Sequence, residues 1–132
     1  MNDWQKMYDK LNAVPPGKRR LAKGVVWDKR ADCGCVLGTL VGKEAWPPQG
    51  MSFTATLERI ATGRAREGAQ EALDEFGLVS RSRIESIEIA NDEFVGSREA
   101  RFEHMLAWLK TKAEKAERSA RALAIDTQET PS

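Results

Sequence analysis

The most regular hydrophobic pattern in the chain lies near its C-terminus, where residues 98–125 contain neither glycine nor proline. Apolar residues recur there at alternating intervals of four and three, which places them on one face of a helix. They are Phe102, Leu106, Leu109, Ala113, Ala116, Ala120 and Leu123, with Met105 beside them. The pattern predicts one long C-terminal helix. Its bulky first half belongs in a core, and its alanine-rich second half either projects from the domain or packs on a second chain.

Three further stretches have helical periodicity. Residues 3–13 place apolar side chains on one face, Asn2 or Asp3 is the expected N-cap, and the proline and glycine residues at 15–17 end the helix. Residues 52–62 and 64–76 are predicted to be helical, with Gly77 at the C-terminal cap. Residues 82–91 favour a helix that starts at a Ser82–Glu85 capping box, although their β-branched content leaves a strand open.

The best strand candidate is residues 21–28, because Val25, Val26 and Trp27 favour extended backbone. Residues 29–32 then resemble a turn. The apolar segment 33–42 is too short for periodicity to separate a return strand from a buried helix, and we favour the helix. The fold class predicted is therefore mainly α, with α+β open: a compact helical domain with at most a small β-hairpin near residues 22–41.

A chain of 132 residues is long enough for one core, so residues 1–125 are predicted to form a single domain and 126–132 a disordered tail. The 21 basic and 20 acidic residues nearly cancel, which excludes a chain-wide field for nucleic acid or anionic membrane. No stretch approaches the length of a membrane span. Cys33 and Cys35 are too close in sequence for an unstrained disulfide, which favours reduced thiols and a cytoplasmic location.

The sequence contains few residues suited to catalysis or metal binding. Cys35, His104 and either Asn91 or Asp92 have the residue types of a cysteine hydrolase, but an unreactive, buried Cys35 is the more common situation. Two cysteines and one histidine are too few for a structural zinc site, and no phosphate-binding loop is present. We therefore expect no enzymatic activity, no metal and no cofactor. Asn91 and Asp92 are expected to form a structural turn before the last helix.

Binding remains the main class of function. Trp46 lies beside two prolines and Trp108 lies beside the main apolar stripe, so both are candidates for a surface that binds another protein. Arg19, Arg20 and Arg30 flank Trp27, an arrangement that a nucleotide or nucleic-acid site would also use. Nucleic acid is therefore the alternative ligand, and a homodimer through residues 98–125 is a further possibility.

The order of motifs resembles that of small uncharacterised proteins from bacteria and their phages. The segments that carry this resemblance are LAKGVVWD, GCVLGTL and AND, followed by REARFEHMLAWL. Cys33 and Thr39 depart from the usual pattern. The resemblance implies no known activity, only an accessory protein. Taken together, the sequence predicts a non-enzymatic protein-interaction module, such as a phage-type inhibitor of a host defence system, with a cysteine-dependent hydrolase as the third reading.

Overall fold

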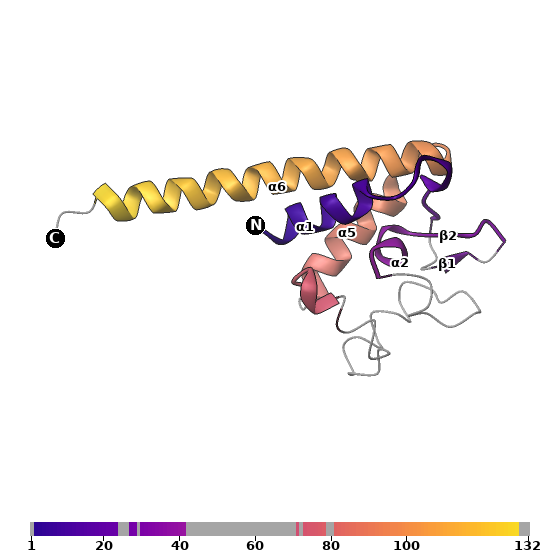
Figure 1. Ribbon diagram of the computed structural model, residues 1–132, viewed down its shortest axis with the longest axis horizontal. Helices are drawn as coiled ribbons and strands as arrows, with labels where there is room; N and C mark the ends of the chain where they lie inside the picture. Colours follow the sequence, from indigo (N-terminus) through magenta and orange to yellow (C-terminus); the bar gives the residue numbers. More distant parts are fainter. Residues whose placement is uncertain are drawn as a thin grey trace.

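The computed structural model describes residues 2–23, 27–28, 30–41, 71, 73–78 and 81–129, and it is mainly helical, as predicted. The predicted helix 52–62, most of the predicted helix 64–76, Val25, Val26 and Trp46 lie outside the described residues. So does the side chain of Trp27. Figure 1 shows the long α6 (Arg98–Glu129) as the spine of the molecule, with α1 (Asp3–Asn12) along it and α5 (Arg81–Glu93) crossing behind α1.

Helix α1 forms where its pattern predicts, because Asn2 caps it and its apolar face finds a partner. The Asn2 side-chain oxygen accepts the backbone N–H of Gln5 at 2.8 Å, and its amide nitrogen donates to the carbonyl of Ala113 on α6 at 3.2 Å. Met7 and Leu11 are fully buried against the core. A short 3₁₀ turn at Pro16–Lys18 then redirects the chain.

The described residues contain a small β-hairpin within the predicted segment 22–41. Strands β1 (Trp27–Asp28) and β2 (Cys33–Gly34) pair antiparallel, with Trp27 opposite Gly34. The Asp28 side chain accepts the N–H groups of Arg30 and Ala31 and so stabilises the intervening turn. The segment 33–42 is part strand and part helix: Cys33–Gly34 pair with β1, and the buried α2 (Val36–Val41) follows at once.

Gly77 ends the helical residues 73–75, as predicted. It has a positive φ of 64°, and the N–H of Leu78 donates to the carbonyl of Leu73 at 2.8 Å while that of Gly77 donates to Asp74 at 3.1 Å. This pair of bonds is a Schellman cap, and the two leucines it joins are both fully buried.

Residues 82–91 are helical, so the strand alternative is wrong. Helix α5 begins at Arg81, which puts Ser82 inside the first turn and not at the cap. It also continues to Glu93, so Asn91 and Asp92 lie in its last turn and do not interrupt it. The helix continues because the Asn91 side chain is satisfied by distant backbone groups and does not compete for its own backbone.

Helix α6 begins after Ser97, whose hydroxyl accepts the N–H of Ala100 at 3.0 Å. Phe102, Met105, Leu106, Leu109 and Ala113 are buried between α1, α2 and α5, as the stripe predicts. Beyond α1 the helix extends away from the other described elements (Figure 1). There Ala120 is exposed, and Leu123 keeps 68% of its surface exposed.

The Gly77 cap gives a direct test of this arrangement. Gly77→Ala should lower the free energy of unfolding by about 2 kcal/mol or more, because an L-residue is strained at this φ and its Cβ would overlap the Asp3 carboxylate. Chemical denaturation measures the change. Gly17→Ala is the matched control, since nothing lies within 4 Å of an added Cβ there. Equal stabilities for the two variants would contradict the structure.

Candidate functional site

A groove with a volume of about 550 Å³ lies between α5 and α6. That volume is within the range of small-ligand and peptide-anchor pockets. Its lining combines apolar and polar side chains from both helices and from the turn between them: Ser86, Ile89, Ala90, Glu93, Phe94, Val95, His104, Trp108 and Lys112. We call this feature the α5–α6 groove.

Two large apolar side chains of the groove are exposed to solvent. Ile89 has 52% of its surface exposed and Val95 has 88%. Single exposed apolar residues are ordinary on protein surfaces, but these two line the same groove together with an aromatic ring. The combination is typical of a binding surface.

Trp108 is held in place by a layer of rings and cations. Its ring meets Trp4 of α1 edge to face, with centroids 5.7 Å apart, and the ammonium of Lys112 lies 5.2 Å from the Trp108 ring. The Arg83 guanidinium lies 5.1 Å from the other ring, Trp4, and its NH1 group also donates to Asp3 at 3.1 Å. Trp108 is therefore a rigid anchor at the groove.

His104 belongs to the same groove and is not in contact with Cys35. Its ring stacks on Phe94 at 4.6 Å, with 19° between the planes. The groups that act on the Cys35 thiol are instead Glu88 and the N–H groups of Leu37 and Gly38. Complete burial raises the pKa of this thiol well above its usual value, and the charge of Glu88 raises it further. The cysteine–histidine arrangement considered from the sequence is not assembled.

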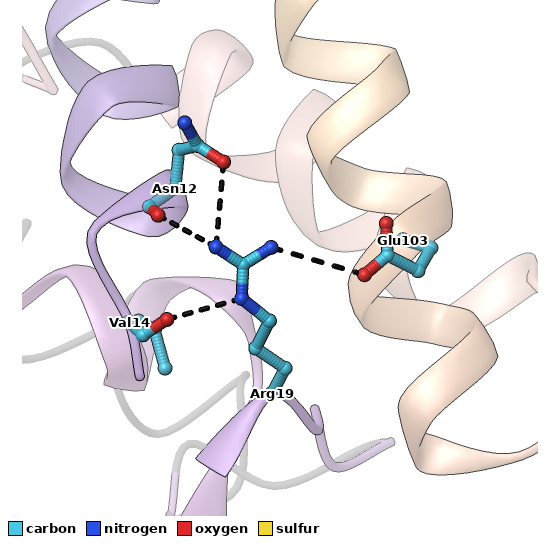
Figure 2. A network of polar contacts seen from close by, with 4 residues as sticks. All are labelled: Asn12, Val14, Arg19 and Glu103. Carbon is cyan, nitrogen blue, oxygen red and sulfur yellow. Dashed lines mark hydrogen bonds and ion pairs between the residues drawn. The ribbon is translucent and has the colours of Figure 1, made fainter. Parts of the chain in front are cut away.

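Arg19, which the sequence predicted to bind a partner, instead caps α1 at its C-terminus. Figure 2 shows its guanidinium between the end of α1 and α6: Nε donates to the carbonyl of Val14 at 3.0 Å and NH2 to that of Asn12 at 2.7 Å. NH1 lies 3.9 Å from Glu103, and the guanidinium covers the ring of Phe102 at 5.3 Å. This arginine is engaged within the fold.

Arg20 and Arg30, the other two arginines predicted to bind a partner, have different surroundings. Arg20 donates from Nε to the carbonyl of Ala31 at 3.1 Å and so supports the hairpin turn. Its charge and that of Arg98 act on the Cys33 thiol, whose pKa is nonetheless raised, chiefly by burial. Arg30 is exposed.

Sequence reasoning missed a buried polar cluster around Asn91 and Arg101. The Asn91 side-chain oxygen accepts the N–H of Val36 at 3.2 Å, and its nitrogen donates to the carbonyl of Ala22 at 3.0 Å. Arg101 donates to the carbonyls of Asn91, Leu21 and Phe94 at 3.0 to 3.3 Å. Only the asparagine was singled out from the sequence, and for a turn; nothing in the pattern of α6 distinguishes Arg101 from its exposed basic residues.

Glu88 is the second residue that sequence reasoning missed. It is 1% exposed, and neither carboxylate oxygen has a hydrogen-bond partner of normal geometry. Desolvation by burial, helped by the charge of Asp92, raises the pKa of this carboxyl from 4.5 to about 7, while contact with the Cys35 thiol acts in the opposite direction. The described residues contain no cluster of three or more potential metal ligands, and none of their helices is long and apolar enough to cross a membrane.

Comparison with protein-family models, curated proteins and solved structures finds no match to this chain.

Substitutions at Asn91 and Asp92 test whether this pair belongs to the buried polar cluster or forms only a local turn. Asn91→Ala should lower the free energy of unfolding by about 2–4 kcal/mol, because it leaves the N–H of Val36 and the carbonyl of Ala22 buried without partners. Asp92→Ala should lower it by about 1 kcal/mol, the usual loss for a half-buried hydrogen bond such as the one that Asp92 accepts from Asn91 at 2.9 Å. Urea unfolding measures both. A larger loss at Asp92 would show that the cluster has been misassigned.

Proposed function

We propose that this protein is a non-enzymatic interaction module that binds another protein through the α5–α6 groove. The observation that carries the proposal is the groove itself, in which exposed Ile89 and Val95 lie with Trp108. Rigid aromatic anchors surrounded by polar groups are the usual centres of binding energy in protein interfaces. Here Ser86, Glu93 and Lys112 supply the polar groups.

A helical segment of the partner is the ligand that suits this groove. Its two walls are helix faces, with residues 86, 89, 90 and 93 on α5 and 104, 108 and 112 on α6. Each set follows helical spacing, so each wall presents one continuous row of side chains. A third helix with an apolar face would lie between such rows, as in helix-in-groove recognition.

The role of a phage-type inhibitor of a host defence system is the finer form of this proposal, and the sequence resemblance supports only the idea of an accessory protein. The two free cysteines support a reducing, cytoplasmic location for it. Nucleic-acid binding is less favoured for two reasons. Arg19 and Arg20 are engaged within the fold. The hollow at the start of α6, with a volume of about 460 Å³, is lined by the acidic residues Asp28 and Glu99 as well as by Lys23, Arg98 and Arg101, so its charges are mixed. A cysteine hydrolase is the least favoured reading.

A photo-crosslinking residue at Val95 tests the groove in host lysate. We expect it to capture a discrete partner, identified by mass spectrometry. The same residue at Lys110 is the matched control: it is exposed and, being two positions from Trp108, lies on the opposite side of α6. Ile89→Glu should weaken binding of the captured partner at least tenfold, because it places a charge in the apolar part of the groove. Identical capture at both positions, or unchanged affinity, would refute the proposal.

A second copy of the chain is a further candidate partner, for a different surface. Residues 102–113 of the predicted dimerisation helix use their apolar stripe within the protein's own core, so only the end of α6 remains available. There the stripe continues through half-buried Ala116, exposed Ala120 and exposed Leu123. Small residues at these positions allow a second helix to approach closely.

Sedimentation equilibrium tests self-association. The full chain should form a homodimer, and a chain truncated after Lys115 should be monomeric while keeping Ala113 and its bond to Asn2. Leu123→Asp should also weaken the dimer, because it puts a charge on the exposed stripe. A full-length chain that stays monomeric at high micromolar concentration would exclude the dimer, and a dimer that survives truncation would place it elsewhere.

A further inference from the structure

The Glu88 carboxyl is buried in a place where its charge is not balanced. It lies on α5, on the face that packs against α2, and it interacts with the Cys35 thiol just before α2. Both carboxylate oxygens lack a hydrogen-bond partner of normal geometry. An ionised carboxylate in such a site loses its hydration without receiving compensating bonds.

Among the residues that the structure describes, the charged groups near Glu88 do not supply compensation. On α5 itself, Asp92 is one turn away and repels a negative charge at Glu88. Before α2, Cys35 is a thiol whose own pKa is raised well above its usual value, so it is neutral at physiological pH. On α6, the buried Arg101 is bound to three backbone carbonyls, and no described salt bridge joins it to a carboxylate. A proton is the simplest way to remove the charge of Glu88.

Helix α5 connects this buried site to the α5–α6 groove. Ile84, Ile87, Glu88 and Asn91 form its buried face. Residues 86, 89, 90 and 93, which line the groove, lie on the other face of the same thirteen-residue helix. Because a helix of this length moves as a unit, any change in how its buried face packs on α2 also shifts the groove wall.

We propose that Glu88 is a proton-operated switch: its protonated form lets α5 pack closely on α2, and its ionised form loosens that packing and changes the shape of the groove. The inference rests on the proposed function, because it describes the regulation of the same groove. The switch operates near neutral pH.

The direction of the effect follows from proton linkage. The pKa of Glu88 is about 7 in the folded protein against an ordinary value of 4.5, so the folded state binds the proton more tightly than the unfolded state. Stability from this group is therefore fully present below pH 4.5 and is lost as the pH rises through 7. Between pH 5.5 and 8 this pKa difference corresponds to a rise of roughly 30-fold in the unfolding equilibrium constant.

Comparison with Glu88→Gln isolates this contribution, because glutamine matches the protonated side chain in shape and cannot ionise. The unfolding constant of the wild type should rise roughly 30-fold more than that of the variant between pH 5.5 and 8. Glu114→Gln, at an exposed carboxyl on α6 outside the groove, should keep the wild-type profile. Parallel profiles for the wild type and Glu88→Gln would overturn the proposal.

A nuclear magnetic resonance titration of the wild type tests the switch without relying on a variant that folds. The side-chain carboxyl carbon of Glu88 should titrate near pH 7, and the amide signal of Val95 and the indole N–H signal of Trp108 in the groove should change with the same midpoint. A midpoint near 4.5 would overturn the proposal, and so would groove signals that do not follow Glu88. Neither measurement involves a partner. If the titration behaves as expected and crosslinking captures nothing, the proposed function fails while the proton-driven change in α5 stands.

Discussion

Two buried side chains, Asn91 and Arg101, fix how the helices of this protein are placed relative to one another. Asn91 joins the end of α5 to the N–H of Val36 at the start of α2 and to the carbonyl of Ala22. Arg101 joins the first turns of α6 to the carbonyls of Leu21, Asn91 and Phe94. The backbone itself adds bonds from Leu21 to Arg98 and from Ala22 to Gly34. These bonds are directional, so they set positions that apolar contacts alone would leave adjustable.

The angle between α5 and α6 is a consequence of this cluster, and the groove is a consequence of the angle. The two helices meet at the turn held by Arg101 and separate away from it, while Trp4 of α1 occupies part of the space between them, against Trp108. Ile89 and Val95 have no described element to cover them. The same cluster fixes the rotation of α5 about its own axis, because Asn91 must face Val36. Glu88, three residues earlier, is thereby directed into the interior.

Local signals in the sequence predicted the local structure well. The Asn2 cap, the Gly77 cap and the apolar stripe of α6 act on neighbouring residues, so their partners are visible in the sequence itself.

The buried cluster was not predictable in that way, because Asn91 bonds to groups 55 and 69 positions away. An asparagine near the end of a helix has the same local pattern whether it forms a turn or a long-range bond. Arg19 illustrates the same limit: a basic stretch does not reveal which guanidinium will cap a helix. For the groove, the sequence pointed to Trp108 but not to Ile89 or Val95, whose exposure depends on the angle between the helices.

The rigid cluster around Asn91 and Arg101 holds the Glu88 carboxyl in the interior, which destabilises its charged form and couples its proton to the groove. An apolar side chain of similar length, such as methionine, would fill the same volume without losing hydration, so the carboxyl contributes nothing to packing that a neutral residue could not. Its position is imposed by Asn91, which prevents α5 from turning the carboxyl toward water. The fold therefore holds an acid where its ionisation opposes the packing of the helix that forms the groove wall. A looser interface would rotate and hydrate the carboxyl, and the coupling between proton and groove would be lost; the coupling depends on the rigidity of the hydrogen bonds around it.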